Sequence, residues 1–234
     1  VNRCNLFITE PLSNPLKNID IELDFAAFVP NQVFEILNSE EKTKFDAIKK
    51  IIIGGGEINE SLHSLLKGVK TDVFQTFGMT ETVSHIAIKQ VCPQHQTQYQ
   101  ALKGIHFSSD ENKRLIIFAP QLETNAIQTN DCIKLIDEHT FEWLGRFDNI
   151  INTGGIKVNP ETIEQKIKKH IKTEFIVGCK PDEKLTHKLI LIVEGKEIVS
   201  LEKVNQELNK FEQIKEIKHI EKFERTSSNK IKRQ

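Results

Sequence analysis

Two short apolar runs that both end in glycine constrain the fold of the first half of this chain. Residues 49–53 run into three consecutive glycines, and residues 72–77 run into one. Residues 30–37, ahead of the first run, and residues 58–66, between the two, carry apolar side chains at helical spacing. Strands that alternate with helices predict a parallel α/β sheet, in which ligands bind beyond the carboxyl ends of the strands. The two glycine positions are therefore the first candidates for a ligand site.

The pattern changes twice after the second glycine end. Residues 104–145 hold four short strand candidates separated by turns, which predicts a small antiparallel β unit. Beyond residue 147, short strands and amphipathic helices predict a compact α+β domain. We therefore expect two domains, residues 1–147 and residues 148–234, the first combining a partial parallel α/β sheet with the β unit. Near the amino end, residues 19–23 alternate at period two and predict either a strand or an extended lead-in.

The second expected domain has the clearest helix start. Asn159, Pro160 and Glu161 supply an asparagine cap, a proline at the first helical position and an acid in the first turn. This helix should run to about residue 170. A second helix is expected over residues 201–211, with Val204, Leu208 and Phe211 on one face. Strands are expected over residues 174–179, 188–193 and 216–223.

Composition limits the class of protein. The 234 residues include 32 basic and 33 acidic side chains, and a net charge of −1 gives no attraction to nucleic acid or an anionic membrane. Apolar runs stay far below the ~20 residues that span a bilayer. The cysteines at 4, 92, 132 and 179 form no Cys-x-x-Cys pair, which predicts reduced thiols in a cytoplasmic protein. Cys92 and His95 stand three apart, but a packing role is favoured over a metal site.

Phe77-Gly78-Met79-Thr80-Glu81 follows directly on the second strand candidate. A ring face, a hydroxyl and a carboxylate within five residues can hold a purine, touch a phosphate and bind Mg²⁺ through a hard oxygen ligand. A helix start, with Thr80 as the cap and Glu81 in the first turn, is the plainer alternative. At Gly54-Gly55-Gly56 the missing Cβ atoms permit a flat ligand close to the backbone, and a tight turn is the alternative.

Four further segments follow in order: Thr129-Asn130-Asp131, Gly145-Arg146-Phe147-Asp148, Thr153-Gly154-Gly155 and residues 226–233. With the segment at 77–81 ahead of them, they resemble the motifs of the adenylate-forming superfamily. That superfamily includes acyl- and aryl-CoA synthetases, luciferases and the adenylation domains of peptide synthetases. Within it, the segments are most similar to the 2-succinylbenzoate–CoA ligases of menaquinone biosynthesis. Asn130 and Asn229 replace glycines of the family pattern. At position 130 this is a mild departure, because asparagine tolerates positive φ better than most residues.

The resemblance implies an ATP-dependent ligase that forms an acyl-adenylate and then an acyl-CoA thioester, with ATP, Mg²⁺ and coenzyme A as cosubstrates. It assigns catalytic roles to Lys230, Thr80 and Glu81, with Glu81 as the metal ligand. Nucleotide binding is assigned to Gly54, Gly55, Gly56, Phe77, Gly78, Asp131 and Arg146. Asp148 would be the hinge of the C-terminal domain, and Gly154 and Gly155 would meet coenzyme A. Thr82, Ser84 and His85 would form the border of the acyl pocket.

Each assignment has a plainer alternative. Arg146 and Asp148 alone would be a surface pair, the two glycines at 154–155 a linker, and Lys230 part of a solvated basic tail. Phe25 and Phe28 either line the acyl pocket or belong to the core. Another acyl- or aryl-CoA ligase, an amino-acid-activating domain and a non-catalytic nucleotide-binding module also fit the motifs, and a homodimer is compatible with them.

A Ser/Thr/Gly-rich loop with a lysine grips the ATP phosphates in the family, and no such loop precedes Gly54. We therefore expect that the chain lacks an N-terminal portion of the enzyme. On that expectation, the isolated chain should adenylate poorly while keeping contacts to adenine and ribose.

Overall fold

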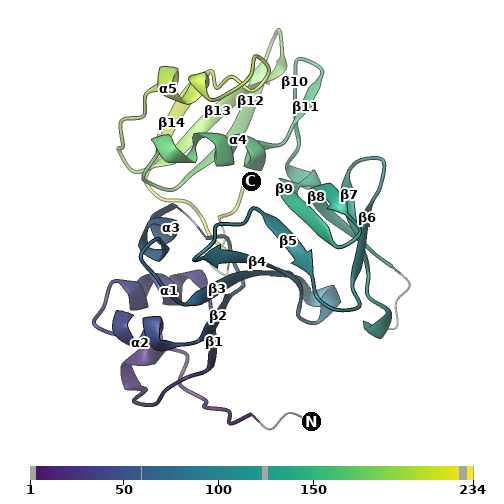
Figure 1. Ribbon diagram of the computed structural model, residues 1–234. Helices are drawn as coiled ribbons and strands as arrows, with labels where there is room; N and C mark the ends of the chain where they lie inside the picture. The colour runs from purple at the N-terminus through teal and green to yellow at the C-terminus, as the bar shows by residue number, and fades with distance from the viewer. Residues whose placement is uncertain (1–3, 59, 123–125, 227–230, 234) are drawn as a thin grey trace. The chain divides into compact units, whose positions relative to one another are not determined.

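The computed structural model describes residues 4–58, 60–122, 126–226 and 231–233 (Figure 1). The chain forms two compact units. The first unit comprises residues 1–79 and 84–97, and the second comprises residues 80–83 and 98–234.

The first unit is built on four neighbouring strands in the order β1-β2-β3-β4. Strands β1 (Phe25–Phe28), β2 (Lys50–Ile53) and β3 (Asp72–Gly78) are parallel, and β4 (His85–Cys92) runs antiparallel to β3. Helices α1 (Pro30–Leu37) and α2 (Lys42–Ala47) connect β1 to β2, and α3 (Glu60–Leu66) connects β2 to β3. The 3₁₀ turn η1 (Pro15–Asn18) precedes them. The parallel α/β sheet expected from the sequence is confirmed, and β1, α2 and β4 are additions to it.

The apolar faces of these elements form one core. Buried side chains of the strands, Ile51, Ile53 and Val73, belong to the same cluster as Val33 of α1 and Leu62 of α3. Phe28 is buried in this core, whereas Phe25 is exposed, so the core alternative holds for Phe28. Residues 19–23 form neither strand nor helix, and the extended lead-in is the correct alternative there.

The second unit begins with an antiparallel sheet in the strand order β5-β9-β8-β7-β6. Its strands are β5 (Gln98–Ala101), β6 (His106–Ser109), β7 (Arg114–Phe118), β8 (Ile127–Asp137) and β9 (Thr140–Arg146). Phe141 anchors the buried face, with ring centroids 4.9 Å from Phe107 and 5.5 Å from Tyr99. The antiparallel β unit expected over residues 104–145 is confirmed, with β5 as an extra strand.

The remainder of the second unit contains the predicted first helix and three strands, together with a hairpin that was not predicted. A hairpin of β10 (Ile151–Thr153) and β11 (Ile156–Val158) leads into α4 (Pro160–Ile167), which continues as the 3₁₀ turn η5 (Lys168–His170). The Asn159 side chain caps α4 by accepting a hydrogen bond from the Glu161 N–H at 3.2 Å. Strands β12 (Phe175–Asp182), β13 (Thr186–Glu194) and β14 (Glu216–Ile220) form a three-stranded sheet, with α5 (Leu201–Gln206) between β13 and β14.

The helix expected over residues 201–211 is shorter than predicted and ends at Gln206. The Gln213 side chain donates to the carbonyl oxygens of Asn205, Leu208 and Asn209 at 3.1, 2.9 and 3.1 Å. These bonds satisfy backbone acceptors that a longer helix would use, so the chain turns here. Phe211 is therefore exposed, and its predicted place on the buried face with Val204 and Leu208 is wrong.

All four cysteines are free thiols. Burial raises the pKa of the Cys92 thiol, which lies 2.9 Å from the carbonyl oxygen of Leu66. The packing role expected for Cys92 agrees with this position. Burial also raises the pKa of the Cys132 thiol on β8.

Within the part of the chain that the structure describes, no helix has the length and apolar character needed to cross a membrane.

Candidate functional site

The carboxyl ends of β2 and β3 lie side by side, because the strands are parallel neighbours with Ile53 paired with Gln75. The glycines at 54–56 leave β2 at this end, and Gly78 closes β3. The Gln75 side chain is buried, and its Nε2 donates to the carbonyl oxygen of Gly56 at 3.3 Å. A buried amide thus fixes the glycine turn, and the sequence analysis missed it because an isolated glutamine in a strand carries no signal.

A hollow of ≈ 250 Å³ lies at this end of the first unit, lined by Gly55, Thr76, Gly78, Met79, Ser84 and His85. It brings together two residues of the predicted nucleotide set with two of the predicted acyl set. Ser84 Oγ and His85 Nδ1 are 3.2 Å apart, so a hydroxyl and an imidazole are presented together. Phe77 is not among the lining residues, and its stacking on a purine stays a prediction.

The start of β4 lies very close to the end of β3. A Cβ atom on Gly78 would lie 2.6 Å from the Cα of His85 and 2.6 Å from the carbonyl oxygen of Ser84. Any other residue would have to displace the main chain, so glycine is required at this position. Gly78 therefore places Ser84 and His85 at the hollow, whatever ligand the hollow takes.

The segment after β3 is the 3₁₀ turn η2 (Thr80–Thr82), which the Val83 N–H closes by donating to the Thr80 carbonyl oxygen at 3.0 Å. Val83 has φ 63, a left-handed conformation that is unusual for a β-branched residue. Such strain is often found at ligand sites. Glu81 is exposed, whereas Thr82 is buried, and a place for Thr82 at an acyl pocket stays a prediction.

Asp131, the acid of the predicted nucleotide set, is held by hydrogen bonds to both its backbone and its side chain. Asp131 lies on β8 and is buried, with 7% of the residue exposed. The Trp143 indole N–H donates to its carboxylate Oδ1 at 3.0 Å. The Asp131 N–H donates to Thr129 Oγ1 at 3.0 Å, and that hydroxyl donates to the Leu115 carbonyl oxygen at 3.0 Å. Backbone and side chain of Asp131 are thus both fixed, and Trp143 is a positioning residue that the sequence analysis missed.

Arg146 lies opposite Asp131 on β9, with its NH1 3.6 Å from Asp131 Oδ2 and its NH2 3.1 Å from Asp148 Oδ2. Asn130 Nδ2 donates to the same Asp148 oxygen at 3.3 Å. Asn130 lies within β8 and is not among the described residues with positive φ, so the expectation that it replaces a left-handed glycine is wrong. The structure instead gives Asn130 a contact with Asp148, the predicted hinge residue.

The amino end of α4 packs against β9 in the second unit. Thr162 Oγ1 donates to the Leu144 carbonyl oxygen at 3.0 Å, and Asn149 donates to Glu161 Oε1. Gly145 has φ 131, and a Cβ atom there would lie 2.6 Å from Glu161 Oε2. The glycine of the Gly-Arg-Phe-Asp segment is therefore required for this packing.

Arg233 connects the end of the described chain to α4. Its NH1 and NH2 donate to the two oxygens of Glu164 at 2.7 and 2.6 Å, and Glu164 also accepts from the Val177 N–H at 2.6 Å. Burial raises the pKa of the Glu164 carboxyl, and Arg233 offsets only part of this effect. Arg233 matches the last position of the segment at 226–233, but the sequence did not indicate its partner.

The remaining predicted residues divide into two groups. Gly154 and Gly155 form the exposed turn of the β10–β11 hairpin, and the Gly154 N–H donates to the Leu185 carbonyl oxygen at 2.7 Å. Lys230, the predicted catalytic lysine, lies outside the described residues. The roles of all three residues stay predictions, as does the domain boundary between residues 147 and 148.

Among solved structures, the chain is similar to an AMP-forming acyl-CoA synthetase/AMP-acid ligase II-like protein from Dyadobacter fermentans. The sequences are 34% identical, the TM-score is 0.59, and the match covers 95% of this chain and 67% of that protein. No protein-family model and no curated protein matches the chain.

The chain is also similar to o-succinylbenzoate CoA synthetase from Bacillus subtilis. The complex of that enzyme with the acyl-adenylate intermediate OSB-AMP has a TM-score of 0.75 at 19% identity, covering 91% of this chain and 50% of that one. Its complex with ATP and magnesium ion has a TM-score of 0.71 at 18% identity, covering 91% and 51%. At these identities the similarity shows the fold alone, and the chain spans about half the length of that enzyme.

Proposed function

The chain belongs to the AMP-forming acyl-CoA synthetase family, and on this premise we propose that it acts as an ATP-dependent acid–CoA ligase in two steps. In the first step, a carboxylate oxygen of the acid attacks the α-phosphorus of ATP, and pyrophosphate leaves. In the second step, the thiol of coenzyme A loses its proton to solvent and attacks the acyl carbonyl of the adenylate, and AMP leaves. The observation that carries the proposal is the buried, doubly fixed carboxylate of Asp131.

The proposal gives Asp131 the two ribose hydroxyls of ATP. A carboxylate accepts hydrogen bonds from both hydroxyls of a vicinal diol, and the Trp143 indole and Arg146 guanidinium keep it oriented before the ligand arrives. Preorganisation of this kind lowers the entropic cost of binding. We assign the adenine to the side of the hollow that Gly55 and Gly78 line, next to Phe77 in sequence, and the acid to the side that Ser84 and His85 line.

Glu81 is suited to Mg²⁺, because its exposed carboxylate lies on a turn and can be reached by a ligand with phosphates. Mg²⁺ is usually held by one or two carboxylates together with substrate phosphates, and it supplies charge neutralisation at the phosphates. Thr80, one residue earlier, can donate its hydroxyl to a phosphate oxygen. Lys230 would add a positive charge near the α-phosphate.

For the second step we propose that the C-terminal segment rotates about Asp148 and brings the β10–β11 turn to the adenylate. Asp148 is held by Arg146 and Asn130 through exposed contacts, which cost little to break. The exposed Gly154 and Gly155 leave the backbone accessible to the pantetheine arm of coenzyme A. Contacts of α4 with β9 would have to break in the same movement.

We propose 2-succinylbenzoate as the acid. The polar pair of Ser84 and His85 at the hollow suits a substrate with a second carboxylate or a keto oxygen better than a fatty chain. Motif similarity to the ligases that use this acid points the same way. Another acyl- or aryl-CoA ligase shares the rest of the machinery, so the acid is what distinguishes this proposal from that alternative.

The experiment that tests the function uses the full native protein with Mg·ATP, coenzyme A and a panel of carboxylic acids that includes 2-succinylbenzoate. Thioester products are identified by mass spectrometry. Succinylbenzoyl-CoA supports the whole proposal, and a different thioester keeps the reaction but discards the substrate. AMP or ATP binding without any thioester would replace the ligase by a nucleotide-binding module.

Asp131→Asn and the exposed Glu111→Gln form a matched pair for this assay. Asp131→Asn should raise the KM for ATP by about tenfold or more, since a charged acceptor of two hydroxyl groups is lost. Glu111→Gln should leave the rate unchanged. Equal rates for the two variants would remove Asp131 from the nucleotide site.

A further inference from the structure

Three side chains of types that can bind a metal ion meet on the antiparallel sheet of the second unit, and the proposed ligase uses none of them. His106 begins β6, and Glu138 and His139 form the turn between β8 and β9. Their ligand atoms all lie within 4.8 Å of one another. The two imidazole rings have centroids 4.8 Å apart, and His139 Nε2 lies 3.5 Å from Glu138 Oε1.

The orientation of His139 leaves its ligating nitrogen available. Nδ1 lies 3.1 Å from the carbonyl oxygen of Ile105. A carbonyl oxygen only accepts hydrogen bonds, so Nδ1 carries the proton in this contact. In the neutral ring, Nε2 then has a free lone pair, and that atom faces the Glu138 carboxylate. Histidine ligands of metals are commonly fixed in this way by a carbonyl behind the ring.

The turn that carries two of the ligands is also held in place by its backbone. The Phe107 N–H donates to the Glu138 carbonyl oxygen at 2.8 Å, and the Ala101 N–H donates to the His139 carbonyl oxygen at 2.8 Å. The His139 N–H in turn donates to Asp137 Oδ1 at 2.8 Å. These bonds fix the backbone of the turn against β5 and β6, so only the side chains have to move to close around an ion.

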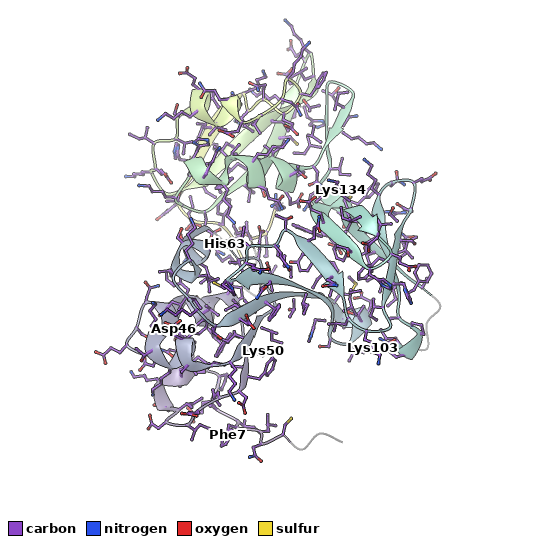
Figure 2. All side chains as sticks on the ribbon, viewed as in Figure 1. Phe7, Asp46, Lys50, His63, Lys103 and Lys134 are labelled. Atoms are coloured by element: carbon purple, nitrogen blue, oxygen red, sulfur yellow. The ribbon has the colours of Figure 1, made fainter. Side chains whose placement is uncertain are left out.

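We propose that His106, Glu138 and His139 form a binding site for Zn²⁺. Two imidazole nitrogens and one carboxylate oxygen are a typical Zn²⁺ ligand set, and a fourth position stays open for water. The site is accessible, since the side chains of His139 and Glu138 are 49% and 73% exposed. Figure 2 labels Lys103, which lies in the turn leading to His106.

The nitrogen ligands distinguish this site from the proposed magnesium position at Glu81. Mg²⁺ prefers oxygen ligands in an octahedral arrangement and keeps most of its water, whereas imidazole favours Zn²⁺. The bound ion would connect the start of β6 to the β8–β9 turn and stabilise that end of the sheet. The proposal does not depend on ligase activity, and either can fail without the other.

The test measures Zn²⁺ binding to the full metal-free protein by competition with a chromophoric chelator, in the presence of excess Mg²⁺. We expect one Zn²⁺ per chain at this site. His106→Ala and His139→Ala should each weaken binding by about tenfold or more, and the double variant should abolish it. His187→Ala, which removes a histidine of β13, is the control and should bind as the parent does.

Unchanged affinity in the double variant would overturn the proposal and assign the zinc to another site, such as the free thiols. A second measurement, made on the parent protein, tests the site even if the variants fail to fold. In the parent protein, ¹⁵N NMR of the imidazoles should show a Zn²⁺-dependent shift at Nε2 of His139, with Nδ1 still protonated. A spectrum that stays unchanged on saturation with Zn²⁺ would also refute the site.

Discussion

Replacing Arg233 by methionine tests how the end of the chain is held to α4. Methionine keeps an unbranched apolar side chain and removes the guanidinium, so Glu164 retains only the Val177 N–H, at 2.6 Å, as a described donor. The two lost hydrogen bonds, at 2.7 and 2.6 Å, are charge-assisted. Bonds to charged groups contribute about 1.5–3 kcal/mol each.

The side chains of Arg233 and Glu164 are 26% and 15% exposed, so water compensates for part of this loss. We expect Arg233→Met to lower the free energy of unfolding by about 3 kcal/mol at neutral pH, the lower end for a broken buried pair. Burial already raises the pKa of the Glu164 carboxyl, and loss of Arg233 should raise it further.

The sign of the pH dependence follows from this shift. A carboxyl whose pKa is higher in the folded than in the unfolded state stabilises the fold below its unfolded pKa. That contribution disappears as the pH rises through the folded pKa. The deficit of Arg233→Met relative to the parent should therefore be largest at neutral and alkaline pH and should shrink on acidification.

Urea unfolding across this pH range measures the effect, with two further variants as controls. Glu164→Gln combined with Arg233→Met should recover part of the loss, because the Glu164 carboxylate is then no longer buried without its partner. Recovery should be incomplete, since the buried Glu161, whose Oε1 lies 3.7 Å from Arg233 Nε, loses that cation in both variants. Lys232→Met removes a neighbouring cation whose pair with Glu224 is largely exposed at 3.7 Å, and it should cost no more than about 0.5 kcal/mol. The reasoning is refuted if Arg233→Met costs no more than Lys232→Met, or if its deficit is independent of pH.

Three further substitutions test other features of the structure. Gly145→Ala should lower the free energy of unfolding by about 3 kcal/mol, because φ 131 and the contact with Glu161 Oε2 both disfavour a Cβ atom; a loss under about 1 kcal/mol in urea would contradict this packing. Val83→Asn should raise the free energy of unfolding by about 1 kcal/mol, because asparagine tolerates φ 63 better, and a lower urea midpoint would speak against strain. Trp143→Phe should raise the KM for ATP by about tenfold with a smaller change in kcat, since Asp131 Oδ1 loses its donor; an effect on kcat alone would point to another role.

Those parts of the fold that follow from local chemistry could be predicted from the sequence. Apolar runs that end in glycine gave the parallel strands β2 and β3, and the asparagine cap with proline gave the start of α4. The four strand candidates of the antiparallel unit are present as well. Each of these signals depends on neighbours in the sequence, which is why the sequence alone was sufficient.

Contacts between distant residues could not be predicted. The donor that orients Asp131 is Trp143 on the neighbouring strand, and the partner of Arg233 is Glu164, 69 positions away. Phe211 fits a helical face in the sequence, but Gln213 folds back and ends the helix first. Asn130 illustrates a different limit, because a resemblance suggested a backbone role where the structure shows a side-chain contact.

The exposed and the buried cysteines should differ in their rate of alkylation, and this difference can be used to measure local opening of the structure. Cys4 and Cys179 are exposed, whereas Cys92 and Cys132 are buried with raised pKa values. An alkylating reagent at neutral pH should therefore modify the first two quickly and reach Cys132 only when the sheet around β8 opens. Cys132 follows Asp131 directly in the chain. Its rate of alkylation would thus measure, without any engineered label, how often the strand that carries the proposed ribose-binding acid separates from its neighbours.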